Sequence, residues 1–288
     1  MGRTFRVVMF LVVAVIAGSA FVWWQCMRSA PKMAAVPPAA SEQSPPSPPV
    51  VPAPATSAPA IRYPVPAAAP SRAALPSLDR ADAYVENALV ELLGRKAVQS
   101  FLHLDGFARN FVATVNNLAT DNAAAQIWPV SVTTGRFDTE LRDGRLVIRA
   151  RNADRYAAFV RFADGVDTQR AVTLYVRLYP LFQRAYEELG YPDRYFNDRV
   201  VEVIDNLLAT PDVADPIEVK RIAVDGATSA TGGLCVFADP ALEAATSGQK
   251  ILLRVGHEDR VKLMAKLDGI RKRIASSAVV TDGARTTH

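Results

Sequence analysis

Apolar residues recur every three or four positions through most of residues 77–275, the spacing that gathers side chains on one face of an α-helix. The first such segment spans residues 77–94. Ser77 or Asp79 can cap its start, and Gly94 can end it. Its apolar stripe consists of Tyr84, Val85, Ala88, Leu89 and Leu92. Repetition of this pattern along the chain predicts a compact, mainly α-helical domain.

Residues 168–190 form the most apolar of the predicted helices, because hydrophobic side chains occupy most of the helix circumference. This distribution is typical of a helix at the centre of a domain. Pro180 is expected to kink or restart the helix, and Gly190 to end it. Shorter helical patterns cover residues 105–120, 152–165, 195–211, 239–246, 248–256 and 257–274. The stripe of the segment at 105–120 consists of Phe107, Phe111, Val115 and Leu118.

Two regions break the helical pattern and predict β-structure. In residues 136–150, Asp143 and Gly144 stand between short alternating runs, which is the preferred chemistry of a two-residue hairpin turn. Residues 216–224 and 234–238 have the composition of two further strands joined by a loop at 225–233. We therefore expect a small antiparallel β-sheet within the helical domain, an α+β fold in which helices dominate.

One predicted helix raises a question of function, because Asp198, Glu202 and Asp205 recur at spacings of four and three. Three carboxylates on one face are compatible with a catalytic or metal site, and equally with the solvated side of an amphipathic helix. At 100° per residue they lie nearly opposite an apolar arc. The arc comprises Phe196, Val200, Val203, Ile204 and Leu207. We interpret the acids as a solvated face.

Asn197 falls inside the apolar arc of the same helix. An amide in that position either caps the helix or is buried and must find hydrogen-bond partners. Both alternatives give Asn197 a structural role.

The sequence contains no recognisable catalytic, cofactor-binding or metal-binding constellation. The three histidines, His103, His257 and His288, show neither metal-ligand spacing nor a nucleophile–His–acid pattern. We interpret His103 as a partly buried packing residue and Cys235, in an apolar strand, as an inert core thiol. The other cysteine, Cys26, lies far upstream, which excludes a disulfide within the domain. We assign no catalytic residue, no cofactor and no metal.

The N-terminal region has a different character. Residues 7–27 carry no charge, and such a helix can cross a hydrocarbon core of about 30 Å. Trp23 and Trp24 suit the headgroup level. A cleavable signal peptide is the alternative, but the apolar run exceeds the length usual for one. We predict an uncleaved transmembrane helix after a short flank, residues 1–6, with the N-terminus in the cytoplasm and the C-terminal domain in the periplasm.

A Pro/Ala-rich linker, residues 28–76, follows the predicted span. Fourteen of the twenty prolines lie in residues 31–76. Proline fixes φ and removes an amide donor, so neither helix nor sheet propagates, and we expect a disordered, semi-rigid spacer reaching up to about 140 Å. A PxxP ligand is the alternative to a plain spacer, which the composition favours. Residues 276–288 are polar and are expected to form a disordered tail after a globular domain at 77–275.

The net charge of +4 belongs to the anchor and linker. Residues 1–76 carry six basic side chains and one acidic side chain, so residues 77–288 sum to −1. A nearly neutral domain disfavours nucleic acid as a partner. A basic run near the end is expected on the outer face of the last helix. It comprises Lys262, Lys266, Arg271, Lys272 and Arg273.

Three stretches carry a resemblance to a known family: "LPSLDRADAYVENAL", "YPLFQRAYEELGYPDRYFNDRVVEVIDNLLATP" and "FADPALEAATSGQKILLRVG". They resemble the bacterial family named domain of unknown function 3014, and the likeness covers most of residues 75–275. The resemblance implies a single-pass envelope protein whose exported C-terminal domain follows a proline-rich spacer. It brings no activity, ligand or catalytic residue.

These features predict a non-catalytic interaction module, tethered to the bacterial inner membrane and meeting an envelope protein or a cell-wall component. The alternative is a hydrolase of cell-wall glycan or peptide that uses carboxylates, from the exposed acidic face or from Asp193 and Asp205. Glycoside chemistry would require two carboxyl groups converging in a cleft, about 5–9.5 Å apart.

Overall fold

The computed structural model describes residues 60–66, 75–121, 127–131, 133, 135–222 and 234–276. The predicted membrane span at 7–27, most of the linker, the loop at 225–233 and the tail beyond residue 276 lie outside this range. Among the helices that are described, none is both long and apolar enough to cross a membrane.

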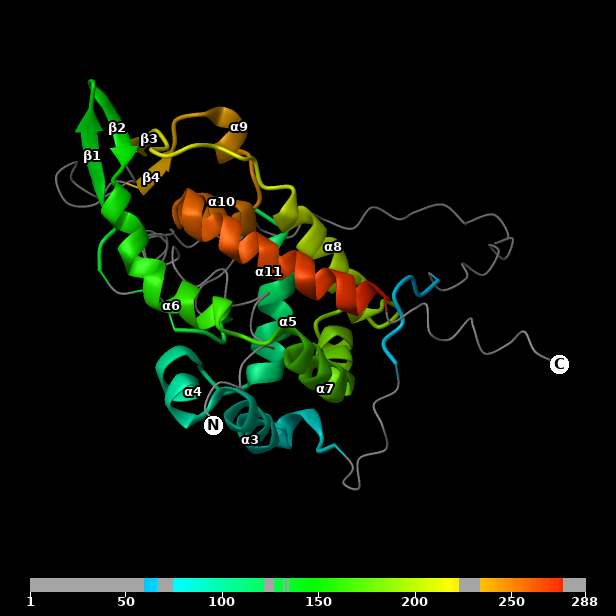
Figure 1. The fold of residues 1–288 in the computed structure, drawn as a ribbon. Helices are drawn as coiled ribbons and strands as arrows, with labels where there is room; N and C mark the ends of the chain where they lie inside the picture. The colour runs from blue at the N-terminus through cyan, green and yellow to red at the C-terminus, as the bar shows by residue number, and fades with distance from the viewer. Residues whose placement is uncertain are drawn as a thin grey trace, which may run out of the picture.

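The described part of the chain is mainly helical, as predicted (Figure 1). The helices are α3 (Asp82–Leu93), α4 (Arg95–Phe101), α5 (Phe107–Leu118), α6 (Asp154–Asp164), α7 (Thr168–Glu188), α8 (Phe196–Leu208), α9 (Pro240–Glu243), α10 (Ser247–Arg254) and α11 (His257–Ser276). Short 3₁₀ turns, η1 (Leu78–Arg80) and η3 (Ala150–Ala153), precede α3 and α6. The strands are β1 (Thr139–Arg142), β2 (Arg145–Ile148), β3 (Val219–Ile222) and β4 (Leu234–Phe237).

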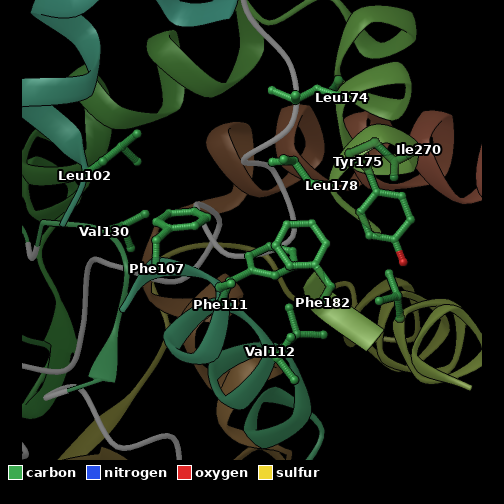
Figure 2. Close-up of a cluster of buried hydrophobic side chains, with 14 of the residues drawn as sticks. Leu102, Phe107, Phe111, Val112, Val130, Leu174, Tyr175, Leu178, Phe182 and Ile270 are labelled. Carbon is green, nitrogen blue, oxygen red and sulfur yellow. The ribbon is translucent and has the colours of Figure 1, made fainter. Parts of the chain in front are cut away.

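Helix α7 supplies ten buried side chains to the main core, but its prediction as a central helix holds only in part, because Thr173, Pro180 and Arg184 on its other side are exposed. It packs against α3, α5, α8 and α11. Figure 2 shows aromatic and aliphatic side chains of α5 and α7 meeting there, among them Phe111, Leu178 and Phe182. The rings of Phe111 and Phe182 lie 4.7 Å apart between centroids. Of the two alternatives for Pro180, a kink or a restart, the restart is wrong, because α7 continues through this residue as one helix.

The predicted helix ends are correct at one position and wrong at another. Gly94 ends α3 with a φ of +81°, a conformation that favours glycine. Neither proposed N-cap works, because Ser77 makes no capping hydrogen bond and Asp79 pairs with Arg109 across 2.6 Å. Helix α4 was not predicted, since its seven residues bury only Val98 and therefore carry almost no periodic signal.

Two small antiparallel sheets replace the single sheet that we expected. Strands β1 and β2 form the predicted hairpin, with Asp143 and Gly144 at positive φ in its turn. Strands β3 and β4 form a second antiparallel pair. The two pairs are linked by a single β-bridge, Val147 to Glu218. This contact is too short to make one continuous sheet of the four strands. Six buried residues form a separate smaller core here: Ile148, Ile217, Val219, Phe237, Leu242 and Leu253.

Helix α10 crosses the ends of α5 and α8 so closely that only glycine fits at the contact. A Cβ atom on Gly248 would lie 2.4 Å from a methyl carbon of Leu207 and 3.0 Å from the carbonyl oxygen of Leu118. We expect Gly248→Ala to lower the free energy of unfolding by about 1–3 kcal/mol through overpacking. Urea denaturation followed by circular dichroism measures this change.

Gly269 provides the matched control for that substitution. It lies within α11, and the nearest atom to an added Cβ would be 3.6 Å away. Gly269→Ala should leave stability unchanged or raise it by up to about 1 kcal/mol, the gain in helix propensity. Equal destabilisation by both substitutions would contradict the packing of α10 described above.

Candidate functional site

The acidic face of α8 is the site that sequence analysis singled out. The apolar arc is confirmed, because Phe196, Val200, Val203, Ile204 and Leu207 are all at most 2% exposed. On the opposite side Glu202 and Asp205 are exposed, whereas Asp198 is half-buried. The prediction of a solvated face therefore holds for two of the three acids.

Glu202 and Asp205 are both engaged in ion pairs. Glu202 lies 2.8 Å from Arg199, one turn earlier on the same helix. Asp205 accepts two hydrogen bonds from the guanidinium of Arg271 on α11, which raises the pKa of that arginine. Asp193, named for the hydrolase alternative, is exposed in the turn before α8. The Glu202 pair thus lies within α8, and the Asp205 pair connects α8 to α11.

Asp198 holds a piece of the predicted linker. Residues 60–66, here called the docked segment, lie against α8 and α11 near the C-terminal end of α11 (Figure 1). The carboxylate of Asp198 accepts hydrogen bonds from the backbone amides of Arg62, at 3.0 Å, and Tyr63, at 2.8 Å. The docked segment is therefore seated on the domain, contrary to the disorder expected for the whole linker.

Two neighbours of Asp198 complete the recognition of the docked segment. The amide of Val65 donates to the Tyr195 hydroxyl at 2.8 Å, and the Asn197 side chain donates to the Tyr63 carbonyl at 2.8 Å. The side chains of Tyr63 and Val65 pack against the main core. Because most of these polar contacts involve backbone groups, the arrangement binds an extended chain largely through its main chain.

Asn197 is the buried amide of the two sequence alternatives. It is 0% exposed, and the N-cap position belongs to Tyr195. Its oxygen accepts from the Tyr175 hydroxyl at 3.0 Å, and its nitrogen also donates to the Ile274 carbonyl at 3.3 Å. One side chain thus joins α7, α8, α11 and the docked segment.

The tyrosines around Asn197 act as neutral hydrogen-bonding groups. Burial raises the pKa of Tyr175 well above its usual value, and it raises the pKa of Tyr179 in the same way. Both hydroxyls therefore stay protonated across the ordinary pH range. Tyr179 donates to Gln183 at 2.9 Å and accepts from the Asn197 amide at 3.3 Å. Such a cluster suits positioning better than proton transfer.

The remaining candidate residues lie elsewhere. His103 is exposed and lines an open cavity of about 280 Å³ with Glu86 and Asp105, so its interpretation as a partly buried packing residue is wrong. Its position directly after α4, at the surface, is the physical reason. Cys235 is a half-buried free thiol on β4. Within the described ranges, no group of three or more His, Cys, Asp and Glu residues could hold a metal ion.

The predicted outer position of the basic run on α11 is correct for Lys262, Lys272 and Arg273, which are exposed, whereas Lys266 and Arg271 are half-buried. Lys266 donates to the carbonyls of Asp164 and Val166, and Lys272 pairs with Asp268. Lys266, like Arg271, therefore connects α11 to a neighbouring element, whereas the pair made by Lys272 lies within α11.

Comparison of the sequence with known protein families gives a match. The profile described as "Protein of unknown function (DUF3014)" matches residues 107–271, more than half of the chain. The chain belongs to this family. Searches of curated proteins and of solved structures found no match.

The DUF3014 match begins at the start of α5, after α3 and α4, and ends at residue 271, within α11. It contains Asn197 and Asp198 but excludes the docked segment that these residues bind. The sequence had pointed to Asp198 through charge spacing, whereas no signal in the linker indicated its contact with α8. The distance along the chain, 136 residues between Arg62 and Asp198, explains why.

Removal of Asp198 should release the docked segment. Trypsin cleaves after Arg62, and in the native protein the amides on both sides of that residue's α-carbon bind the Asp198 carboxylate. In Asp198→Ala we expect cleavage there to accelerate by about tenfold or more, because charge-assisted hydrogen bonds are lost and the segment opens more often. Mass spectrometry of timed digests of the full chain measures the rate.

Glu202→Ala is the matched control, since it removes the same charge from the same helix and the ion pair of Glu202 in the described part of the chain is with Arg199. Its cleavage rate should match that of the native chain. Equal acceleration in both variants would show that charge on α8, rather than the Asp198 contact, governs the segment.

Proposed function

We propose that this protein is a single-pass inner-membrane protein that displays a non-catalytic interaction domain in the periplasm, where it meets an envelope protein or a cell-wall component. The charge-free run at 7–27 and the proline-rich stretch after it support the tether. The observation that carries the proposal is the binding of the docked segment, a part of this linker, to the domain. Its hydrogen bonds are made by Asp198, Asn197 and Tyr195.

The docked segment gives the tether a defined exit point. The roughly 30 residues between the predicted span and the segment would reach up to about 100 Å as extended polyproline. They join the domain near Ile274, at the C-terminal end of α11, whereas His257 at its other end contacts Asp215 beside the sheets. A helix of this length spans about 30 Å, so the sheets lie at the end remote from the tether.

A carboxylate-based hydrolase has less support. The acids considered for it on α8 bind Arg199, Arg271 and the backbone of the docked segment. A catalytic acid or base must be available to substrate and tuned for proton transfer. We therefore do not advance this alternative.

Membrane topology is tested by C-terminal fusions. A reporter enzyme that is active only after export should be active behind residue 288, and a reporter active only in the cytoplasm should be silent. The physical reason is the orientation expected from the short N-terminal flank and the uncleaved span. The opposite pattern, or recovery of a shortened chain in the soluble fraction, would overturn the tethered arrangement.

The interaction role is tested by crosslinking in intact cells, with neighbours identified by mass spectrometry. The full chain and residues 60–276 exported on a cleavable signal should capture the same partner, because recognition is assigned to the domain. The second version includes residues 60–66 since they bind α8. Loss of the partner without the anchor would assign recognition to the membrane helix. Release of wall fragments by the purified chain would contradict a non-catalytic role.

A further inference from the structure

A second polar site lies at the sheet end, remote from the docked segment. It is a cavity of about 170 Å³ between the β1–β2 hairpin, η3, the Asp215–Pro216 stretch and the junction of α10 and α11. Three arginines line it, Arg142, Arg149 and Arg254, together with one acid, Asp215. The domain as a whole is nearly neutral, so this concentration of positive charge is local.

Arg254 is the least compensated of these cations. Its guanidinium lies over the ring of the buried Phe237, 4.6 Å from the centroid, and donates to the Lys250 carbonyl at 3.3 Å. Among the described residues it pairs with no carboxylate. Burial lowers the pKa of Arg254, which reflects the loss of water around the charge. Glu243 lies near enough to oppose this effect in part, but it forms no ion pair with Arg254. A partly desolvated cation without a direct ion pair favours an incoming anion.

The other two arginines of the cavity already have carboxylate partners. Arg149 lies 3.1 Å from Glu140 and 3.7 Å from Asp138, and Arg142 lies 3.4 Å from Glu140. Arg254 is therefore the cation of the lining that has no ion pair within the described ranges. Asp215 accepts a hydrogen bond of 2.7 Å from the backbone amide of His257, at the start of α11. One carboxylate oxygen of Asp215, the acid in the lining, is therefore bound to the N-terminus of α11.

We propose that this cavity binds an oxyanion, the carboxylate or phosphate end group of a ligand, with Arg254 as its principal donor. A guanidinium presents paired N–H donors that match both groups. The volume of about 170 Å³ admits an end group rather than a whole large ligand. The site does not depend on membrane attachment, so the failure of either proposal leaves the other intact.

Calorimetric titration of the purified full chain in detergent tests the site. The probes are inorganic phosphate and succinate, each in chloride buffer at constant ionic strength. We expect saturable binding of one probe per chain, and the probe with the lower Kd distinguishes phosphate from carboxylate chemistry. Absence of saturable binding by both would overturn the proposal.

Variants assign the binding to the cavity. Arg254→Gln should raise the Kd by about tenfold or more, the loss expected for a charge-assisted contact. Arg145→Gln is the matched control, because Arg145 lies on the same hairpin, is 71% exposed and pairs with Glu218 at the surface. Its Kd should stay within twofold of the native value. An unchanged Kd in Arg254→Gln would overturn the proposal.

A second variant decides the question if Arg254→Gln does not fold, as judged by circular dichroism. Ala150 is exposed and lines the cavity, so Ala150→Phe adds bulk at the cavity wall while keeping all three arginines. It should abolish probe binding and leave the melting curve unchanged. Native-like binding in this variant would place the anion elsewhere and overturn the assignment.

Discussion

The hydrogen bonds of Asn197 are the constraint on which the rest of the arrangement depends. This fully buried amide is satisfied by Tyr175 of α7, by the Ile274 carbonyl of α11 and by the Tyr63 carbonyl of the docked segment. A buried polar group left without partners costs about 1–3 kcal/mol. The amide therefore stabilises the one placement of α7, α11 and the docked segment in which all of these hydrogen bonds are made.

Two acids of α8 bind the same elements as Asn197. Asp198 continues the contacts of Asn197 along the docked segment, and Asp205 connects α8 to α11 through Arg271. These two carboxylates thus position the docked segment and the last helix. The paired arginine at Asp205 is partly exposed, so its contribution to stability is small, and its effect is chiefly on geometry.

Helix α11 separates two ends with different chemistry. Its C-terminal end meets the docked segment, where recognition is through backbone hydrogen bonds and neutral side chains. Its N-terminal end adjoins the small second core and the arginine-lined cavity. In the tethered arrangement that we propose, the second end would face away from the point of attachment, as expected of a module that meets a partner there.

The sequence alone determined most of the helices and the first hairpin. Phe107, Phe111, Val115 and Leu118 define α5 by their spacing, and Asp143 with Gly144 defines the hairpin turn, because helix periodicity and turn chemistry are local properties. Helix α4 could not be predicted, because a seven-residue helix with one buried side chain has no measurable hydrophobic period. Tertiary structure alone decided which partner each polar group found. Asp198 binds residues more than 130 positions away, and Arg254 meets the hairpin at a cavity. Such pairings depend on how helices cross, which no local pattern encodes.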